Sequence, residues 1–283
     1  MRTPRNKNSG PNRGGARRKP ANASGPASGS PTERVSGREG RPPKGQTWLY
    51  GHHAVAAALD NPDRVIHRVV FTGEPIEIKR ETNINAASMS RDALDDLLPP
   101  GAVHQGYAAL VNSLPAVALE DICQRAEISQ DALVVVLDQV SDPQNIGAIL
   151  RSAAVFGALA VIVQDRHAPE VTGAMAKAAS GAVEHMPLVR VTNIVRGLDI
   201  LKNSGFWCIG LDSEADTPIE RAPAAPRQAL VLGAEGPGMR RLTADSCDLT
   251  VRIESEVRSS GPISSLNVSN AAAVALYALS RAR

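Results

Sequence analysis

The sequence predicts an α/β protein in which helices cover both faces of a parallel sheet, preceded by a second, smaller α/β unit. From Asp131 onward, apolar runs of strand length alternate with stretches of helical periodicity. The runs are nearly continuous in Val, Ile and Leu, which is typical of strands buried on both faces. The chain has 283 residues, of which 43% are hydrophobic, so it can bury the core that such a sheet requires.

The larger unit is expected over residues 131–283. Its predicted strands span 133–138, 159–164, 206–212, 229–235 and 249–253, and its predicted helices span 145–157, 170–179, 193–203 and 266–282. Helices between successive strands favour parallel pairing, because each helix returns the chain to the end of the sheet where the previous strand began.

The smaller unit is expected over residues 46–114. A short strand and Gly51 lead into an alanine-rich helix that ends at Asn61-Pro62. Two further strands are predicted over 64–72 and 104–112, and a helix over 89–98 has Ser90 as its expected N-terminal cap. Residues 115–130 are interpreted as the linker to the larger unit.

Residues 1–45 form a basic arm whose composition differs from the rest. The arm contains eleven Lys and Arg but only two acidic residues, a net charge of +9 that leaves −7 for the remainder of the chain. It is rich in Gly, Pro, Ser and Asn and poor in apolar residues, so we expect it to be disordered. A flexible basic segment suits a polyanion, most simply a nucleic acid. A solubilising tail without a specific partner is the alternative.

Composition excludes several classes of protein. No apolar run approaches the ~20 residues that a membrane-spanning helix requires, and the N-terminus lacks the apolar stretch of a secretory leader. The three cysteines, Cys123, Cys208 and Cys247, have no C-x-x-C spacing, so we predict small buried apolar side chains rather than a zinc site or disulfides. The six histidines show no metal-ligand spacing either. We therefore expect a cytoplasmic protein without a metal ion or a membrane partner.

The segment DPQNIGAILRSA, residues 142–153, is the first that could carry chemistry. Asp142-Pro143 predicts a turn after a buried strand, and Asn145 is expected to cap the following helix. The helical spacing of the apolar residues places Arg151 away from the core side of that helix. There its guanidinium could clamp a phosphate, although a capped helix with a solvated arginine is the alternative.

A glycine-rich loop follows a buried strand in ALVLGAEGPGM, residues 229–239. Glycines allow positive φ and a close approach of the backbone to a ligand. The spacing of Gly233, Gly236 and Gly238 differs from the dinucleotide fingerprint, so a plain tight turn is the alternative. Glu235 is the unusual element, because it is an acid at the carboxyl end of a core strand.

The last segment, residues 260–283, predicts a terminal helix that is apolar almost all round and is capped by Ser264 or Ser265. Such a helix is expected to be buried, in part against a second copy of the chain. Asn267 stands in its predicted first turn, where free backbone amides suit an anion. A packing helix without chemistry is the alternative.

Together and in this order, DPQNIGAILRSA, LGAEGPGM and SLNVSNAAA resemble the three motifs of the SpoU/TrmH family of the SPOUT class, whose members are S-adenosylmethionine (AdoMet)-dependent RNA ribose 2′-O-methyltransferases. The YGHHAVAAAL and HQG segments resemble the bacterial branch that methylates a guanosine of large-subunit (23S) rRNA. In that branch an N-terminal domain similar to an RNA-binding ribosomal protein presents the substrate. The resemblance implies a deep C-terminal trefoil knot, an obligate homodimer, AdoMet as cofactor, and 23S rRNA or a ribosomal precursor as partner.

The resemblance also implies which residues form the site. The catalytic neighbourhood would consist of Asn145, Arg151, Glu235, Ser265 and Asn267, and the cofactor contacts of Leu232, Gly233, Gly238, Ile253 and Leu266. Methyl transfer needs the 2′-hydroxyl oxygen in line with the donor and an acceptor for its proton. Arg151 or Glu235 could take that proton. A guanidinium is effectively always protonated and better suits orientation and charge stabilisation, whereas a carboxylate is the more ordinary base.

Two features depart from the family pattern. The loop 254–263 is longer and more polar than the IPM-type turn of the family, and the smaller unit is shorter between Phe71 and Met89. A tRNA ribose methyltransferase and a non-catalytic rRNA-binding or ribosome-assembly factor of the same fold are the alternatives. In the smaller unit, His53 and His104 are candidate RNA contacts.

Overall fold

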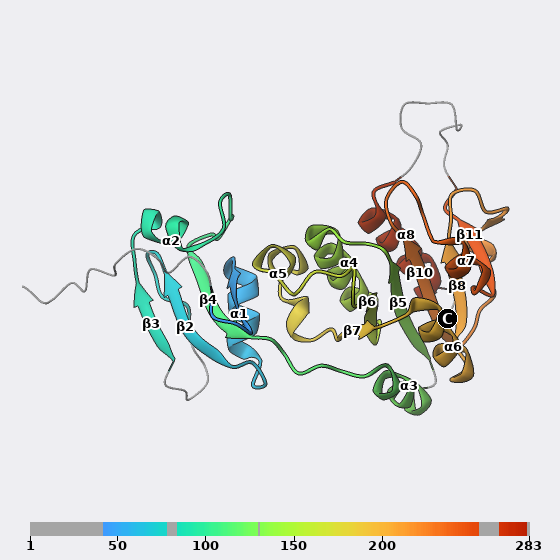
Figure 1. Ribbon diagram of the computed structural model, residues 1–283, viewed down its shortest axis with the longest axis horizontal. Coiled ribbons are helices and arrows are strands. Elements are labelled where there is room, and N and C mark those ends of the chain that lie inside the picture. Colours follow the sequence, from blue (N-terminus) through green and yellow to red (C-terminus); the bar gives the residue numbers. More distant parts are fainter. Residues whose placement is uncertain (1–41, 78–83, 130, 255–265, 282–283) are drawn as a thin grey trace, which may run out of the picture. The chain divides into compact units, whose positions relative to one another are not determined.

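The computed structural model describes residues 42–77, 84–129, 131–254 and 266–281 (Figure 1). The expected basic arm thus lies almost entirely outside the described residues, as does most of the loop 254–263. Among the described helices, none is long and apolar enough to cross a bilayer.

The larger sheet has seven strands in the order β7-β6-β5-β10-β8-β11-β9, and all of its strand pairs are parallel. The strands are β5 (Ala132–Asp138), β6 (Ala160–Gln164), β7 (Leu188–Val191), β8 (Trp207–Leu211), β9 (Thr217–Pro218), β10 (Arg227–Gly233) and β11 (Leu249–Arg252). The predicted parallel sheet and its five predicted strands are confirmed. The implied trefoil knot stays a prediction, because residues 255–265, which join β11 to the last helix, lie outside the described residues.

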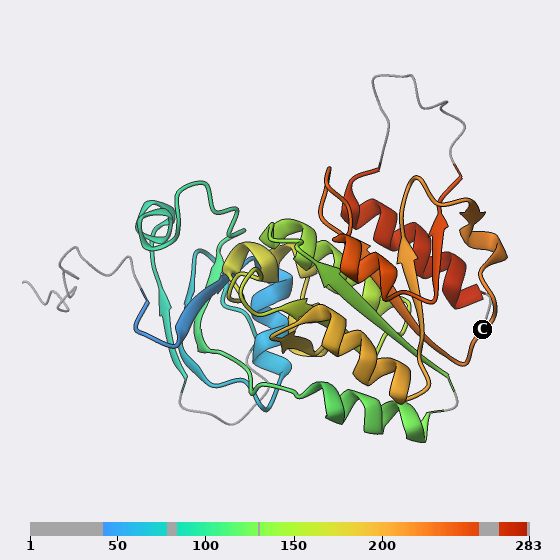
Figure 2. The same cartoon turned by 45° about the vertical axis from the view of Figure 1, so that its right-hand side comes forward.

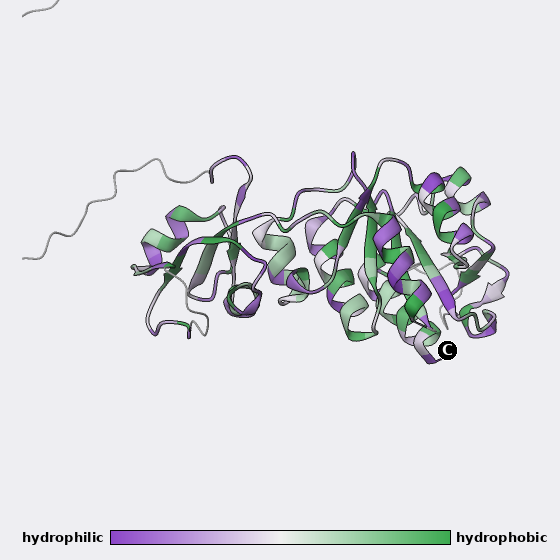
Figure 3. Ribbon diagram, turned by 90° about the horizontal axis from the view of Figure 1, so that it is seen from below, coloured by the Kyte–Doolittle hydropathy of each residue, from purple (hydrophilic) through white to green (hydrophobic). Residues whose placement is uncertain are grey.

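Helices cover both faces of this sheet, as predicted (Figure 2). They are α3 (Leu119–Ile128), α4 (Pro143–Val155), α5 (Gly173–Ala179), α6 (Ile194–Asn203), α7 (Arg241–Asp245) and α8 (Val268–Arg281), with the short 3₁₀ helices η1 (Ala182–Glu184) and η2 (Ile219–Arg221). Helices α4, α5 and α8 share one core cluster with Leu133, Val135 and Leu137 of β5. Helices α3 and α6 share the other with Val134 and Val136. Figure 3 shows the apolar character of these central strands.

Residues 119–128 of the segment interpreted as a linker form helix α3. Leu119, Ile122 and Ala126 recur at helical spacing and are buried against the larger sheet. Asp121 stabilises the helix start by accepting a 3.2 Å hydrogen bond from the backbone N–H of Ala118. Only short stretches on either side of α3 therefore act as connections, and the division of the chain at residues 114 and 131 remains a proposal.

The smaller sheet has the order β1-β4-β2-β3. Its strands are β1 (Gln46–Tyr50), β2 (Ile66–Phe71), β3 (Asn85–Ser88) and β4 (Tyr107–Asn112), and its helices are α1 (His52–Asp60) and α2 (Arg91–Leu97). The predicted α/β unit is thus confirmed. Ser90 caps α2 as expected, because its hydroxyl accepts a 3.2 Å hydrogen bond from the Ala93 N–H.

A buried ion pair joins the smaller sheet to η1. The guanidinium of Arg64 donates to both carboxylate oxygens of Glu184, at 2.9 Å from Nε and 2.8 Å from Nη2. Both side chains are almost fully buried. The side-chain amide of Asn61 adds a 2.9 Å bond to the same carboxylate, and Arg64 also donates to the carbonyl of Asn112. Removing one partner of such a pair costs more stability than the intact pair contributes, because the remaining charge would stay desolvated.

Glu184→Ala is expected to lower the free energy of unfolding by about 3–5 kcal/mol, because it removes the carboxylate that the buried Arg64 guanidinium faces. Urea titration followed by circular dichroism measures this change. Glu170→Ala is the matched control, since Glu170 is exposed and forms no hydrogen bond or ion pair with a described residue. It should alter stability by less than about 0.5 kcal/mol. Equal stability of the two variants would contradict the role of the ion pair.

Candidate active site

The first and third motifs meet through two asparagine side chains. Asn145 lies in the first turn of α4, and Asn267 directly precedes α8. The side-chain amide of Asn267 donates a 3.1 Å hydrogen bond to Oδ1 of Asn145. Oδ1 of Asn267 in turn accepts from the backbone N–H and the hydroxyl of Ser269, at 2.9 and 2.6 Å. Both amides are thereby oriented, and residues 122 positions apart are brought together.

Asp142, not Asn145, caps α4, so the predicted cap is wrong by three residues. The Asp142 carboxylate accepts from the backbone N–H groups of Gln144 and Asn145, at 3.3 and 3.1 Å. Pro143 occupies the first helical position, where its missing N–H costs no hydrogen bond. Because Asp142 satisfies these amides, the Asn145 side chain is available to Asn267.

Arg151 is exposed on α4, whereas Ile146, Ile149 and Leu150 of the same helix are fully buried. The predicted orientation of Arg151 away from the core is confirmed. No described residue forms a hydrogen bond or ion pair with its guanidinium. Such an exposed guanidinium, on the helix that also carries Asn145, can receive an anionic group of a ligand.

The glycine loop folds back on the end of β10. Ala234 and Gly238 form an isolated antiparallel bridge with backbone hydrogen bonds of 3.1 and 3.0 Å. Gly236 and Gly238 have φ of +88° and +69°, which confirms the expectation of positive φ in this loop. A Cβ on Gly233 would lie 2.1 Å from the carbonyl carbon of Gly238 and from the nitrogen of Met239. Only glycine therefore fits at position 233.

The remaining predicted site residues have different surroundings. Glu235 is exposed at the tip of the loop, and its carboxylate has no partner among the described residues. Leu232 is buried and paired with strands on both sides. Ile253 packs against the core, and Leu266 is half exposed. Ser265 lies outside the described residues.

The structure contains a buried ion pair at the base of the glycine loop that the sequence analysis did not predict. Asp138, the last residue of β5, is fully buried, and Nη2 of Arg240 lies 2.6 Å from its Oδ1. The sequence carried one available signal: a charged residue that ends an otherwise apolar strand, the same feature that singles out Glu235.

The three cysteines are free thiols, and Cys123 and Cys208 are buried as predicted, whereas Cys247 is only partly buried. Burial is the main reason that the pKa of Cys208 and that of Cys247 are each raised to about 12. Both thiols therefore stay protonated near neutral pH, and a protonated thiol is a poor nucleophile. Within the described part of the chain, no three His, Cys, Asp or Glu side chains gather closely enough to hold a metal ion.

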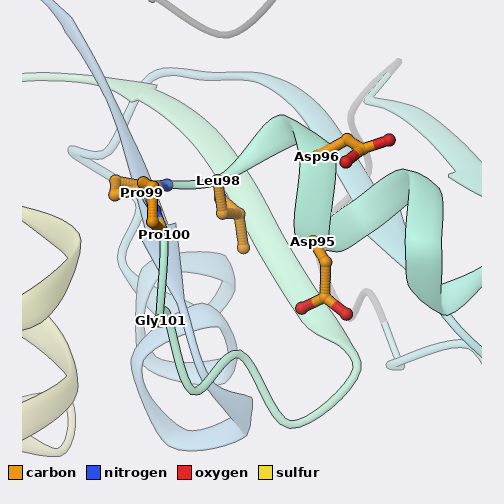
Figure 4. A pocket seen from close by; sticks show the side chains of 6 residues that line it. All are labelled: Asp95, Asp96, Leu98, Pro99, Pro100 and Gly101. Atoms are coloured by element: carbon orange, nitrogen blue, oxygen red, sulfur yellow. The ribbon is translucent and has the colours of Figure 1, made fainter.

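Two features of the smaller unit do not suit RNA phosphates. A pocket at the end of α2 is lined by Asp95, Asp96, Leu98, Pro99, Pro100 and Gly101 (Figure 4), and its two carboxylates would repel an anion. His104 is buried, contrary to the expectation of an RNA contact. Its Nδ1 accepts a hydrogen bond from the Gly106 N–H at 3.0 Å. Nε2 is therefore the protonated ring nitrogen, and it donates to the Asp95 carboxylate at 2.9 Å.

The comparison with protein families decides the relationship. The SpoU rRNA Methylase family model matches residues 132–277, and the model for RNA 2'-O ribose methyltransferase substrate binding matches residues 48–116. The chain belongs to the SpoU rRNA methylase family. The predicted resemblance is thereby confirmed, and the two matches of this SpoU chain fall on the larger and the smaller sheet respectively.

Relatives of this SpoU chain include proteins named as RNA methyltransferases. It is 39% identical over 245 residues to the 23S rRNA (guanosine-2'-O-)-methyltransferase RlmB of Vibrio vulnificus, covering 83% of this chain and 97% of that protein. It is 36% identical to an uncharacterized tRNA/rRNA methyltransferase of Synechocystis, again over 83% of this chain but only 62% of that protein's length. The SpoU methyltransferase AviRb of Streptomyces viridochromogenes, solved with the cofactor AdoMet, superposes with a TM-score of 0.68 at 26% identity. That superposition covers 84% of this chain and 90% of AviRb.

Gly233→Ala is expected to destabilise the protein by about 3 kcal/mol or more, because the atoms that block a Cβ belong to the backbone and cannot rotate away. Thermal unfolding measures the effect. Gly157→Ala is the matched control, since Gly157 has φ of +71° but nothing lies within 4 Å of its would-be Cβ. That control should cost only the about 1–2 kcal/mol of left-handed backbone strain. A smaller loss at Gly233 than at Gly157 would refute the close approach.

Proposed function

We propose that this chain transfers a methyl group from AdoMet to the 2′-hydroxyl of a ribose in RNA, and that its substrate is a guanosine of 23S rRNA. The match to Vibrio vulnificus RlmB carries the proposal, because it extends over 97% of that protein and so includes both the substrate-binding and the methylase regions. A ribosomal substrate places the reaction in the cytoplasm.

The glycine loop suits a bound cofactor. Its tip is exposed and rich in glycine, and its base is held in a fixed conformation, because residues 238–239 pack directly on Gly233. Backbone groups of such a loop can approach a ligand closely. The proposed cofactor contacts are Leu232, Gly233, Gly238, Ile253 and Leu266. AdoMet, when bound there, supplies the methyl group on its positively charged sulfur.

Three groups of the chain have proposed roles in the reaction. Arg151 orients the ribose–phosphate and stabilises the negative charge that develops on the 2′-oxygen. The carboxylate of Glu235 accepts the hydroxyl proton, since no described residue occupies it. The Asn145–Asn267 hydrogen bond fixes the first turn of α4 to the start of α8 and so holds the helix that carries Arg151. Ser265 completes the proposed catalytic group.

We also propose that the chain acts as a homodimer. Exposed apolar side chains gather where α4 packs on α8: Val155 is 73% exposed, Tyr277 58% and Val274 42%. Phe156 and Tyr277 lie edge to face across the two helices, with ring centroids 6.2 Å apart. Val155, Phe156, Val274 and Tyr277 form what we call the α4–α8 patch. A second copy of the same patch, related by a two-fold axis, would remove these side chains from water.

Arg151→Ala is expected to lower kcat about 100-fold or more while the affinity for AdoMet is unchanged, because the lost interaction acts on the developing charge. The measurement is incorporation of label from AdoMet into 23S rRNA, with calorimetry for the cofactor. Arg196→Ala, at an exposed arginine of α6 on the other face of the sheet, is the matched control and should keep full activity. A fully active Arg151→Ala enzyme would exclude Arg151 from the site.

The wild-type assay separates the alternatives. Alkali-resistant label in 23S rRNA is the expected result, because a 2′-O-methyl group blocks cleavage at that ribose. Label confined to tRNA assayed in parallel would favour a tRNA methyltransferase, and label on a base would contradict ribose methylation. Failure to bind AdoMet in calorimetry would favour a non-catalytic RNA-binding factor.

Tyr277→Glu is expected to convert a dimer into monomers in sedimentation velocity, because it places a charge in the centre of the α4–α8 patch. Val103→Glu is the matched control, since Val103 is 61% exposed but belongs to the smaller unit. A wild-type chain that sediments as a monomer at micromolar concentration, or a Tyr277→Glu variant that remains dimeric, would overturn this assignment.

A further inference from the structure

Among the described residues, the carboxylate of Asp138 forms its hydrogen bonds and its ion pair with a single residue, Arg240. Oδ2 accepts a hydrogen bond from the backbone N–H of Arg240 at 2.9 Å, and Oδ1 accepts from Nε of the same residue at 2.9 Å. Nη2 lies 2.6 Å from Oδ1. Asp138 is fully buried, while the Arg240 side chain is 38% exposed. A buried carboxylate is costly unless it is paired and hydrogen-bonded, so this geometry strongly specifies where Arg240 lies.

Arg240 directly follows the glycine loop, and its contacts with Asp138 restrict the conformation of the loop base. The loop is closed at its neck by the Ala234–Gly238 bridge. Met239 then lies over β8, where its Cε would be 2.8 Å from a Cβ on Gly210. The Asp138 contacts hold the next residue to β5. The loop base is thus fixed at successive positions, whereas the tip from Glu235 to Gly238 is exposed.

Asp138 also begins the segment that leads to the first motif. It is followed by Gln139, a non-glycine residue with φ of +63°, and then by the Asp142 cap of α4. Its backbone therefore belongs to the chain that carries Asn145, while its side chain holds the chain that carries Glu235. One carboxylate joins the bases of the two motif-bearing segments, although Asp138 and Arg240 are 102 residues apart.

We propose that Asp138 and Arg240 form a positioning pair for methyl transfer, which holds the glycine loop in its cofactor-binding conformation beside the start of α4. This inference rests on the proposed function, since it takes the loop as the AdoMet site. The pair acts through the loop and has no contact with the reacting atoms. Without it, the loop populates other conformations, and the apparent affinity for AdoMet falls by the fraction that remains competent.

Arg240→Ala is expected to raise the Kd and the KM for AdoMet about 10-fold or more, because a charge-assisted hydrogen-bond pair is lost, while kcat at saturating AdoMet falls much less. Arg240→Lys retains the charge and the backbone N–H but lacks the Nε–Nη2 fork, so its Kd should lie between those of Arg240→Ala and the wild type. Arg241→Ala is the matched control. The Arg241 side chain is 84% exposed and lies 3.8 Å from the exposed Asp245, so this variant is expected to bind AdoMet with wild-type affinity.

The measurements are calorimetry with AdoMet, steady-state methylation of 23S rRNA and thermal unfolding, all on the full chain. A purely structural pair would lower the melting temperature and the active fraction but leave the Kd of the folded protein unchanged; that result overturns the proposal. Should Arg240→Ala not fold, Arg240→Gln decides by the same criterion. If the wild type itself does not bind AdoMet, the proposed function fails first. An effect on Kd without methylation of any RNA would overturn the function but support the pair.

Discussion

The candidate site depends on one strand pairing, that of β10 with β5 at the centre of the parallel sheet. The register places Gly233 opposite Asp138, so both strands end at the same level. Because the strands are parallel, the two segments that follow leave from the same edge of the sheet. One carries Asn145 and the other carries Glu235. A shift of this register would separate the two motif-bearing segments.

Much of the fold is predictable from the sequence because the central strands are buried on both faces. β5, β6 and β10 contain buried runs rich in Val, Ile and Leu, which are typical of central strands in a parallel sheet, whereas β8 and β11 are more mixed in composition. β7 is short and interrupted by Arg190, and β9 has two residues, too few to show a period. The start of α4 is predicted three residues too late, because Asp142 and Asn145 are both common capping residues and the significance of Pro143 at the first helical position is missed.

The chemistry of the candidate site is less predictable, because residue types are visible in a sequence whereas their partners are not. The first and third motifs each contain a conspicuous asparagine, but only the fold shows that Asn145 and Asn267 bond to each other. The ion pairs Asp138–Arg240 and Arg64–Glu184 join residues 102 and 120 positions apart. Which charged residues meet over such separations depends on the three-dimensional arrangement, and one sequence holds no record of it.

The buried Arg64–Glu184 ion pair and the proposed contact of Arg151 with RNA differ in their sensitivity to salt. Mobile ions screen charges in water within about 10 Å at 0.1 M, but they hardly reach a pair whose side chains are 2% and 1% exposed. The exposed guanidinium of Arg151 has no such shelter. If Arg151 binds RNA as proposed, rising ionic strength would weaken that contact long before it weakens the internal pair.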